Sequence, residues 1–144
     1  MNTDRLKHKE ITDVILKSFY EVYNELGNGF LESVYENALY IVLKGYGLSV
    51  ERQKDISVFF RDNIVGDFRA DLMINGKVII EIKAVRAFDP AHEAQLINYL
   101  KATNIEVGLL LNFGKKPEFK RFVYDNKIKN IRGNQRKSAA ESKQ

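Results

Sequence analysis

Three charged residues, Asp71, Glu81 and Lys83, are embedded in the otherwise apolar strands expected between Arg69 and Arg86. Asp71 lies in RADLMI, and Glu81 and Lys83 lie in VIIEIK, with the turn signal Asn75-Gly76 between the two runs. Because burying unpaired charge is unfavourable, such residues need partners or a chemical task. Two carboxylates and an amine are the groups that can bind a hard cation and act on a water molecule beside a phosphate ester.

The register of the hairpin decides whether these groups meet. A two-residue turn at Asn75-Gly76 would place Asp71 opposite Ile80 and mix charged and apolar groups on both faces. A bulge or a three-residue loop would place Asp71 opposite Glu81 and separate the faces. Because a slip of one residue moves every side chain to the other face, the hydrophobic pattern favours the second register. It predicts one face with Asp71, Met73, Ile79, Glu81 and Lys83, and an apolar face with Leu72, Ile74, Val78, Ile80 and Ile82.

In this register the Cβ atoms of Asp71 and Glu81 would lie about 5 Å apart, so both carboxylates could reach one divalent cation. Two carboxylates repel each other unless a cation or a proton intervenes. The chain has no Cys and two His, so a metal site must use oxygen ligands, which suit Mg²⁺ or Mn²⁺. Lys83 would stand beside the ion and could orient water or stabilise negative charge. The alternative is a cross-strand salt-bridge cluster on a solvated face.

Polar residues on two expected helices could complete the site. Glu32 and Tyr35 are three residues apart and therefore share a helix face. On a later helix His92, Gln95 and Tyr99 fall on one stripe beside a core-facing stripe. The alternatives are that Glu32 compensates the helix dipole at the surface and that the polar stripe faces solvent.

The elements that must position these residues follow from the period of the hydrophobic pattern. Apolar residues at spacings of three and four predict a first helix from Thr3 to Leu26, ended by Gly27-Asn28-Gly29, and a second helix to Gly45 or Gly47. Pro90, with Asp89 as N-cap, opens a third helix to about Lys101. Val107 to Phe113 predicts a strand that is buried on both faces, and Glu118 to Tyr124 could be strand or helix. Three or four antiparallel strands are expected between the second and third helices: Leu48 to Arg52, Ile56 to Arg61, Ile64 to Ile74 and Lys77 to Ala84, with turns at Lys54-Asp55, Asp62-Asn63 and Asn75-Gly76.

The 144 residues fit one domain, and the basic excess is confined to its end. The chain has 23 Lys plus Arg against 19 Asp plus Glu, but residues 127–144 hold six basic residues and one acidic residue. We therefore expect a folded domain over 1–126 and a basic, disordered tail over 127–144, which acts either in solubility or as a phosphate-binding arm. No apolar run is long enough for a membrane span, and the charged N-terminus is no secretory signal, so we expect a cytoplasmic protein without membrane contact.

Several motifs resemble those of one known family. GNGFLESVYENAL, with Gly29, Glu32 and Tyr35, is similar to the signature of the GxxExxY proteins, which belong to the PD-(D/E)XK nuclease superfamily. Asp71, Glu81 and Lys83 resemble the superfamily's catalytic set, and Gln95 with Tyr99 resembles the QxxxY motif of RecB-type nucleases. The resemblance runs from about Ile11 to Tyr124. It implies an α/β, restriction-endonuclease-like core, with a central mixed β-sheet flanked by helices and two helices at the N-terminus.

The resemblance also implies roles for the residues. Asp71, Glu81 and the main-chain carbonyl of Ile82 would bind Mg²⁺ or Mn²⁺, with Glu32 binding it directly or through water. Lys83 would be the catalytic lysine. Gln95 and Tyr99 would contact DNA or steady the site, and Tyr35 and His92 are further candidates for nucleic-acid binding.

The leading hypothesis is therefore a metal-dependent nuclease that hydrolyses DNA phosphodiester bonds with metal-activated water. The alternative is a nuclease-fold protein with weak or no turnover that acts as a nucleic-acid-binding or interaction module. Because the chain is small for a self-sufficient nuclease, it could also work as a homodimer or with a partner subunit.

Overall fold

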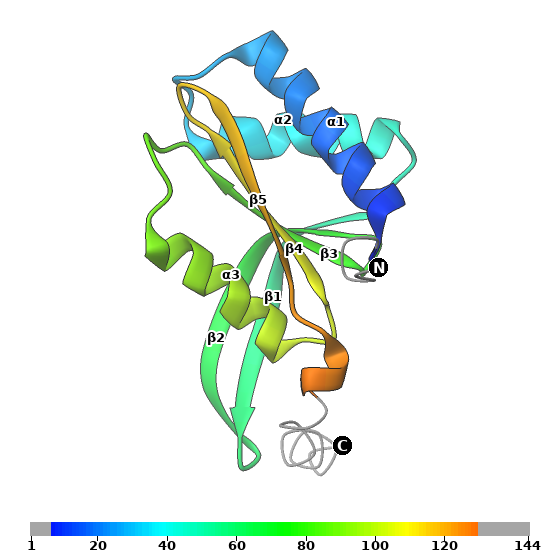
Figure 1. Ribbon diagram of the computed structural model, residues 1–144, viewed down its shortest axis with the longest axis vertical. Helices are drawn as coiled ribbons and strands as arrows, with labels where there is room; N and C mark the ends of the chain where they lie inside the picture. The colour runs from blue at the N-terminus through cyan, green and yellow to red at the C-terminus, as the bar shows by residue number, and fades with distance from the viewer. Residues whose placement is uncertain (1–6, 130–144) are drawn as a thin grey trace.

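The computed structural model describes residues 7–129 and consists of three helices and five strands in one mixed sheet (Figure 1). The helices are α1 (Lys9–Leu26), α2 (Glu32–Gly45) and α3 (Pro90–Ala102). The strands are β1 (Val50–Phe60), β2 (Asn63–Ile74), β3 (Val78–Lys83), β4 (Val107–Phe113) and β5 (Pro117–Val123). This arrangement confirms the α/β fold class and the two N-terminal helices that the sequence predicts.

The sheet has the order β1-β2-β3-β4-β5. All neighbouring strands are antiparallel except β3 and β4, which are parallel and are connected through α3. A parallel pair needs such a crossover, because a tight turn can only join antiparallel neighbours. The crossover begins after Lys83, the last residue of β3, and contains α3 with Gln95 and Tyr99.

Helices cover both faces of the sheet (Figure 1). On one face α1 and α2 pack on an apolar layer that includes Leu72, Ile80 and Ile82. On the other face α3 packs on Met73, Ile79 and neighbouring residues. All seven residues of β4 are buried, as expected for a strand covered on both sides. The sheet is therefore the middle of three layers, and its two apolar faces account for the two cores.

The predicted register of the central hairpin is confirmed. Leu72 pairs with Ile80 and Ile74 pairs with Val78, so three residues, Asn75 to Lys77, form the loop. Asn75 and Gly76 both have positive φ angles of 53° and 63°, and Lys77 N–H donates to Ile74 O. The separation of charged from apolar residues thus outweighed the usual two-residue preference of an Asn-Gly turn.

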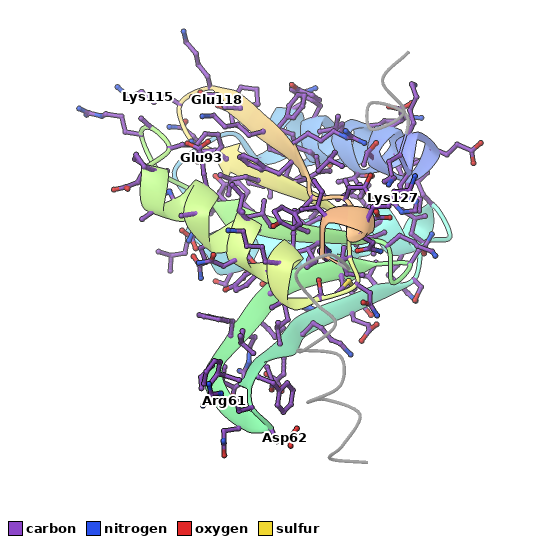
Figure 2. All side chains as sticks on the ribbon, turned by 60° about the horizontal axis from the view of Figure 1, so that its bottom comes forward. Arg61, Asp62, Glu93, Lys115, Glu118 and Lys127 are labelled. Carbon is purple, nitrogen blue, oxygen red and sulfur yellow. The ribbon has the colours of Figure 1, made fainter. Side chains whose placement is uncertain are left out.

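The first hairpin differs from the expectation. β1 is one continuous strand, so the predicted turn at Lys54-Asp55 is wrong. The turn to β2 is formed by Arg61 and Asp62, one residue earlier than expected; both have positive φ angles, as a two-residue hairpin turn requires. The β1–β2 hairpin extends away from the layers, and Figure 2 labels these two residues at its tip.

The first helix starts later than expected, and most of the expected tail lies outside the described residues. The first helix begins at Lys9 rather than Thr3; Lys7 and His8 form a turn, and His8 has a left-handed φ of 55°. Residues 130–144 of the expected tail lie outside the described residues, but its first three residues are described. Lys129 is buried, and its ammonium donates to the carbonyls of Thr103 and Ile105, which attaches this turn to the domain.

None of the described helices has the length and apolar character that a membrane crossing demands.

Candidate active site

Asp71 and Glu81 lie where the central hairpin opens. The described pairing of β2 with β3 ends at Leu72 and Ile80; beyond it, β2 continues along β1 while β3 continues along β4. The two carboxylates take the place of ladder bonds across this opening. Ile82 N–H donates to Asp71 Oδ2 at 2.8 Å, and Asp71 N–H donates to Glu81 Oε1 at 3.2 Å. The two side chains are therefore together, as the register predicts.

Burial makes this pair electrostatically unusual. Glu81 is only 4% exposed, and its burial together with the neighbouring Asp71 raises its pKa to about 9. Burial also raises the pKa of Asp71, although the hydrogen bond from Ile82 N–H acts in the opposite direction. The nearby charge of Lys83 lowers the pKa of both carboxyls, but does not offset burial. The pair consequently favours a bound proton or a cation at this point.

Helix α2 brings further negative charge to Asp71. The charges of Glu36 and Glu32 both raise the pKa of Asp71. Glu32 is exposed in the first turn of α2, which places it beside the site as the sequence predicts. Glu36 is one turn further on the same face, and the sequence reasoning missed it. Its spacing of four from Glu32 was the available signal.

Strand β1 is irregular directly beside Asp71. Arg52 pairs with Leu72 and Lys54 pairs with Ala70, which sets Gln53 opposite Asp71. Gln53 has a positive φ of 50° and is not part of this ladder, and its side chain donates to Glu36 at 2.6 Å. Strands β1 and β3, which flank Asp71, therefore both lack a regular pairing with β2 at this residue. A positive φ angle at a residue other than glycine is uncommon, and such residues cluster at functional sites.

Gln95 and Tyr99 approach the pair from the other side. Gln95 Nε2 donates to the Tyr99 hydroxyl at 2.6 Å, and that hydroxyl lies 3.4 Å from the carbonyl of Arg69. Tyr99 is buried, and its burial together with the charge of Glu81 raises its pKa. Of the two expected roles, this placement supports steadying the site for Tyr99. Gln95 is partly exposed beside it.

His92 and Tyr35 both make hydrogen bonds within the protein, and the burial of Tyr35 revises its expected role. His92 Nδ1 accepts a hydrogen bond from Asp89 N–H at the start of α3, where Asp89 Oδ1 accepts from Ala91 N–H. Tyr35 is fully buried, and its hydroxyl donates to Gly27 O and accepts from Phe30 N–H. A ring without exposed surface has none to offer a nucleic acid. Tyr35 instead fixes the loop that leads to Glu32.

A buried amide positions the segment that follows Lys83. Asn112 lies beside Lys83 in the parallel pairing of β4 with β3 and is fully buried. Its Oδ1 accepts from Val85 N–H at 2.9 Å, and its Nδ2 donates to Val85 O at 2.8 Å. Sequence reasoning missed Asn112; a polar residue inside the apolar run VGLLLNF was the available signal. These two hydrogen bonds fix the main chain at Val85, which closely follows Lys83.

The donor set fits a hard divalent cation. Within residues 7–129 no group of three or more His, Cys, Asp or Glu side chains gathers closely enough to hold a metal ion, so Asp71 and Glu81 act as a pair. Mg²⁺ is commonly held by one or two carboxylates and keeps several waters. Two adjacent carboxylates, one buried with a pKa raised to about 9 and one half-buried, are a suitable partner for such an ion.

The fold has solved relatives. A protein described as "Crystal structure of SSO0001" matches with a TM-score of 0.50 and 21% identity over 78% of this chain. An alkaline exonuclease, LHK-Exo from Laribacter hongkongensis, matches with a TM-score of 0.49 and 13% identity over 76% of this chain. The chain spans 59% and 63% of the lengths of these two chains. No curated protein matches the sequence.

A family model settles the relationship. It is described as the PD-(D/E)XK nuclease superfamily and matches residues 9–122, which include the hairpin with Asp71, Glu81 and Lys83 and all three helices. The mixed sheet with its flanking helices agrees with this match. The chain therefore belongs to the PD-(D/E)XK nuclease superfamily.

Proposed function

We propose that this protein hydrolyses phosphodiester bonds of DNA with the help of Mg²⁺ or Mn²⁺. The observation that carries the proposal is the pairing of half-buried Asp71 with buried Glu81 at the opening of the hairpin, with Lys83 two residues after Glu81 in β3. Burial and the charge of Asp71 raise the pKa of Glu81 to about 9 in the absence of a cation. A site that gathers negative charge in this way is suited to a divalent ion. Membership of the nuclease superfamily supports the reaction class.

Each residue has a proposed task. Asp71, Glu81 and the main-chain carbonyl of Ile82 would hold the cation, with Glu32 acting on it through a water molecule. When bound, a divalent cation polarises the phosphate and lowers the pKa of a water molecule. Lys83 would orient the attacking water and stabilise negative charge that develops on the phosphate. Gln95 and Tyr99 would steady the site from α3, where the Tyr99 hydroxyl lies 3.4 Å from the carbonyl of Arg69.

Assays with purified full-length protein would test the proposal. Single-stranded, duplex and branched DNA would be incubated with Mg²⁺ or Mn²⁺, and cleavage would be followed on denaturing gels. We expect Asp71→Asn, Glu81→Gln and Lys83→Ala each to lower the cleavage rate by about 10²-fold or more, because each removes a group that holds the cation or acts on the water and the phosphate.

Lys77→Ala provides the matched control, because Lys77 is an exposed lysine of the same hairpin at its opposite end. Its cleavage rate should equal that of the wild type. Cleavage that persists unchanged in Lys83→Ala or Asp71→Asn would show that the hydrolysis does not use these residues.

A second candidate is binding of nucleic acid without useful turnover. The charge distribution favours it, since most of the basic excess lies in residues 127–144 rather than in the domain. In that case DNA binding would weaken steeply with salt, would disappear on deleting residues 127–144, and would occur without cleavage.

A further inference from the structure

A cleft of about 260 Å³ lies directly beyond Lys83 along the chain, and the proposed hydrolysis gives it no task. Three connecting segments form its walls: residues 28–30 between α1 and α2, residues 84–86 after β3, and residues 113–115 at the turn from β4 to β5. In Figure 1 these three connections converge at the same end of the molecule. A group held in the cleft would therefore be next to the phosphate on which Lys83 is proposed to act.

Hydrogen bonds fix each wall of the cleft. The Tyr35 hydroxyl joins Gly27 O to Phe30 N–H, and the Asn112 amide joins both main-chain groups of Val85. The Tyr23 hydroxyl lies 2.8 Å and 2.6 Å from the carbonyls of Gly114 and Lys115. A cleft whose walls are already held in place requires little ordering when it binds a ligand.

Packed aromatic rings support these walls. The Phe113 ring lies between Tyr35, at a centroid distance of 4.2 Å, and Phe19, at 4.8 Å. Phe30 packs edge-on against Tyr35 at 6.0 Å, and the Phe30 side chain remains 47% exposed. The exposed part of the Phe30 side chain therefore lies at the edge of the cleft, where packed aromatic rings hold it in place.

The cleft combines this aromatic side chain with positive charge. Arg86 and Lys115 line it and are exposed, and no acidic residue is among its lining residues. In the part of the chain that the structure describes, no ion pair involves either cation. Aromatic side chains that stack with bases, combined with cations that follow the backbone, are how proteins bind single-stranded nucleic acid.

The size of the cleft favours one nucleotide. Its volume is below the roughly 300–1,000 Å³ of sites that enclose drug-sized ligands, so it has no room for stacked base pairs. A base inside a duplex has both faces covered by its neighbours and cannot present one to Phe30. Only an unstacked base can do so.

We propose that this cleft binds an unstacked nucleotide next to the scissile phosphodiester, so that the substrate of the proposed hydrolysis is single-stranded DNA. The Phe30 side chain stacks on the base, and Arg86 and Lys115 contact the adjoining phosphates. The inference rests on the proposed function for its catalytic consequence, and on the cleft alone for binding.

Fluorescence anisotropy with a labelled single strand and a blunt duplex of the same sequence would test the binding. Titrations would use full-length protein carrying Lys83→Ala, so that cleavage does not intervene. We expect Phe30→Ala to weaken binding of the single strand about tenfold, or 1.4 kcal/mol, with no change for the duplex. Phe30→Tyr should retain the affinity because it keeps the ring. Ile41→Ala is the control, since Ile41 is an apolar side chain on α2 that is 69% exposed and does not line the cleft.

The charges would be tested by salt dependence. Lys115→Gln should lower the slope of log affinity against log salt for the single strand by about 0.7, the contribution of one phosphate contact. Arg61→Gln should leave the slope unchanged, because Arg61 is at the tip of the β1–β2 hairpin, at the opposite end of the molecule from Lys115 (Figure 2). Urea unfolding of every variant would confirm that each is folded.

The two proposals would fail in different ways. An equal loss for single strand and duplex in Phe30→Ala, a loss in Phe30→Tyr as large as in Phe30→Ala, or no loss at all would overturn the cleft assignment even if the wild type cleaves DNA. Selective loss for the single strand would support the assignment even if the wild type showed no cleavage, and in that case only the proposed hydrolysis would be refuted.

Discussion

A charge on Glu81 is unfavourable, because the residue is only 4% exposed. Asp71 lies beside it, and among the described residues neither carboxylate forms an ion pair with Lys83. A folded protein that ionises this group therefore loses stability unless a cation compensates the charge.

This predicts a decline of stability with increasing pH. The pKa of Glu81 is about 9 in the folded state against 4.5 for the free side chain, so between these values the native state binds the extra proton and unfolding becomes easier as pH rises. The free energy of unfolding should fall by at most about 1.4 kcal/mol per pH unit for this group. The interval from pH 7 to 9 isolates it, because His8 and Glu106 have lowered pKa values and Tyr99 has a raised one.

Urea unfolding at pH 7, 8 and 9 in the presence of EDTA would measure this slope. Glu81→Gln should flatten it, because the carboxyl whose pKa is raised to about 9 is then absent. Millimolar Mn²⁺ should restore the wild type at pH 8 and have less effect on Glu81→Gln. The explanation is wrong if both proteins show the same slope without metal.

Asn112 is expected to be a positioning residue for Lys83. Replacing it by Ala leaves Val85 N–H and C=O without their partners in a buried environment, which should lower the free energy of unfolding by about 1–3 kcal/mol. Cleavage should fall further than DNA binding, because the displaced segment directly follows the lysine. Asn98→Ala on the exposed side of α3 is the control and should change neither quantity. Equal effects of the two substitutions would remove the positioning role.

At the level of elements, the turn from β4 to β5 is closely packed against the segment after β3. A Cβ atom at Gly114 would lie 2.4 Å from the Val85 carbonyl oxygen and 3.0 Å from Asn112 Nδ2. Backbone therefore occupies the space that a side chain would need. A displacement of one connecting segment therefore displaces the other and changes the cleft that both segments line.

Gly114→Ala should therefore destabilise the protein by about 1–3 kcal/mol, the usual effect of forcing atoms into a filled site. Single-strand binding should weaken with it. Gly45→Ala at the end of α2 is the matched substitution, because a Cβ there meets nothing within 4 Å and its φ is not positive. It should be neutral or slightly stabilising. Denaturant unfolding of both variants would measure the difference, and similar values would contradict the packing argument.

Across the whole molecule, the two ends of the described chain meet at the connection between α3 and β4. Glu106 Oε2 accepts from Lys7 Nζ at 2.9 Å and from Asn126 N–H at 2.8 Å. Lys129 donates to Thr103 and Ile105 in the same connection. One carboxylate thus links the segment before α1 to the segment after β5.

Glu106→Gln should weaken this link in a pH-dependent way. Burial raises the pKa of Glu106, but the hydrogen bonds from Asn126 and Lys7 together outweigh it and lower the pKa. The contribution to stability is therefore present above about pH 4.5 and is lost as pH falls through the lowered value. We expect a loss of about 1–2 kcal/mol at pH 7 that vanishes in acid. Exposed Glu118→Gln is the control, and a pH-independent loss in Glu106→Gln would contradict the electrostatic origin.

Local pattern was sufficient for the central hairpin and the helices. The alternation of charged and apolar residues fixed the register of β2 against β3, because only one register keeps Leu72, Ile80 and Ile82 together on a buried face. Asp89 and Pro90 marked the start of α3 by the chemistry of its first turn. The same reasoning failed for β1, because most of that strand is exposed and polar and is held by main-chain bonds to β2 that side-chain types do not reveal.

The sequence by itself thus determined that Asp71 and Glu81 share one face and that Lys83 follows them, since these relations lie within one hairpin. Only the tertiary structure decided that Glu36 and Gln53 stand beside Asp71, that Asn112 holds the chain after Lys83, and that three distant turns form one cleft. These relations join segments up to about a hundred residues apart, and their geometry depends on how the helices pack on the sheet. No local periodicity records that packing.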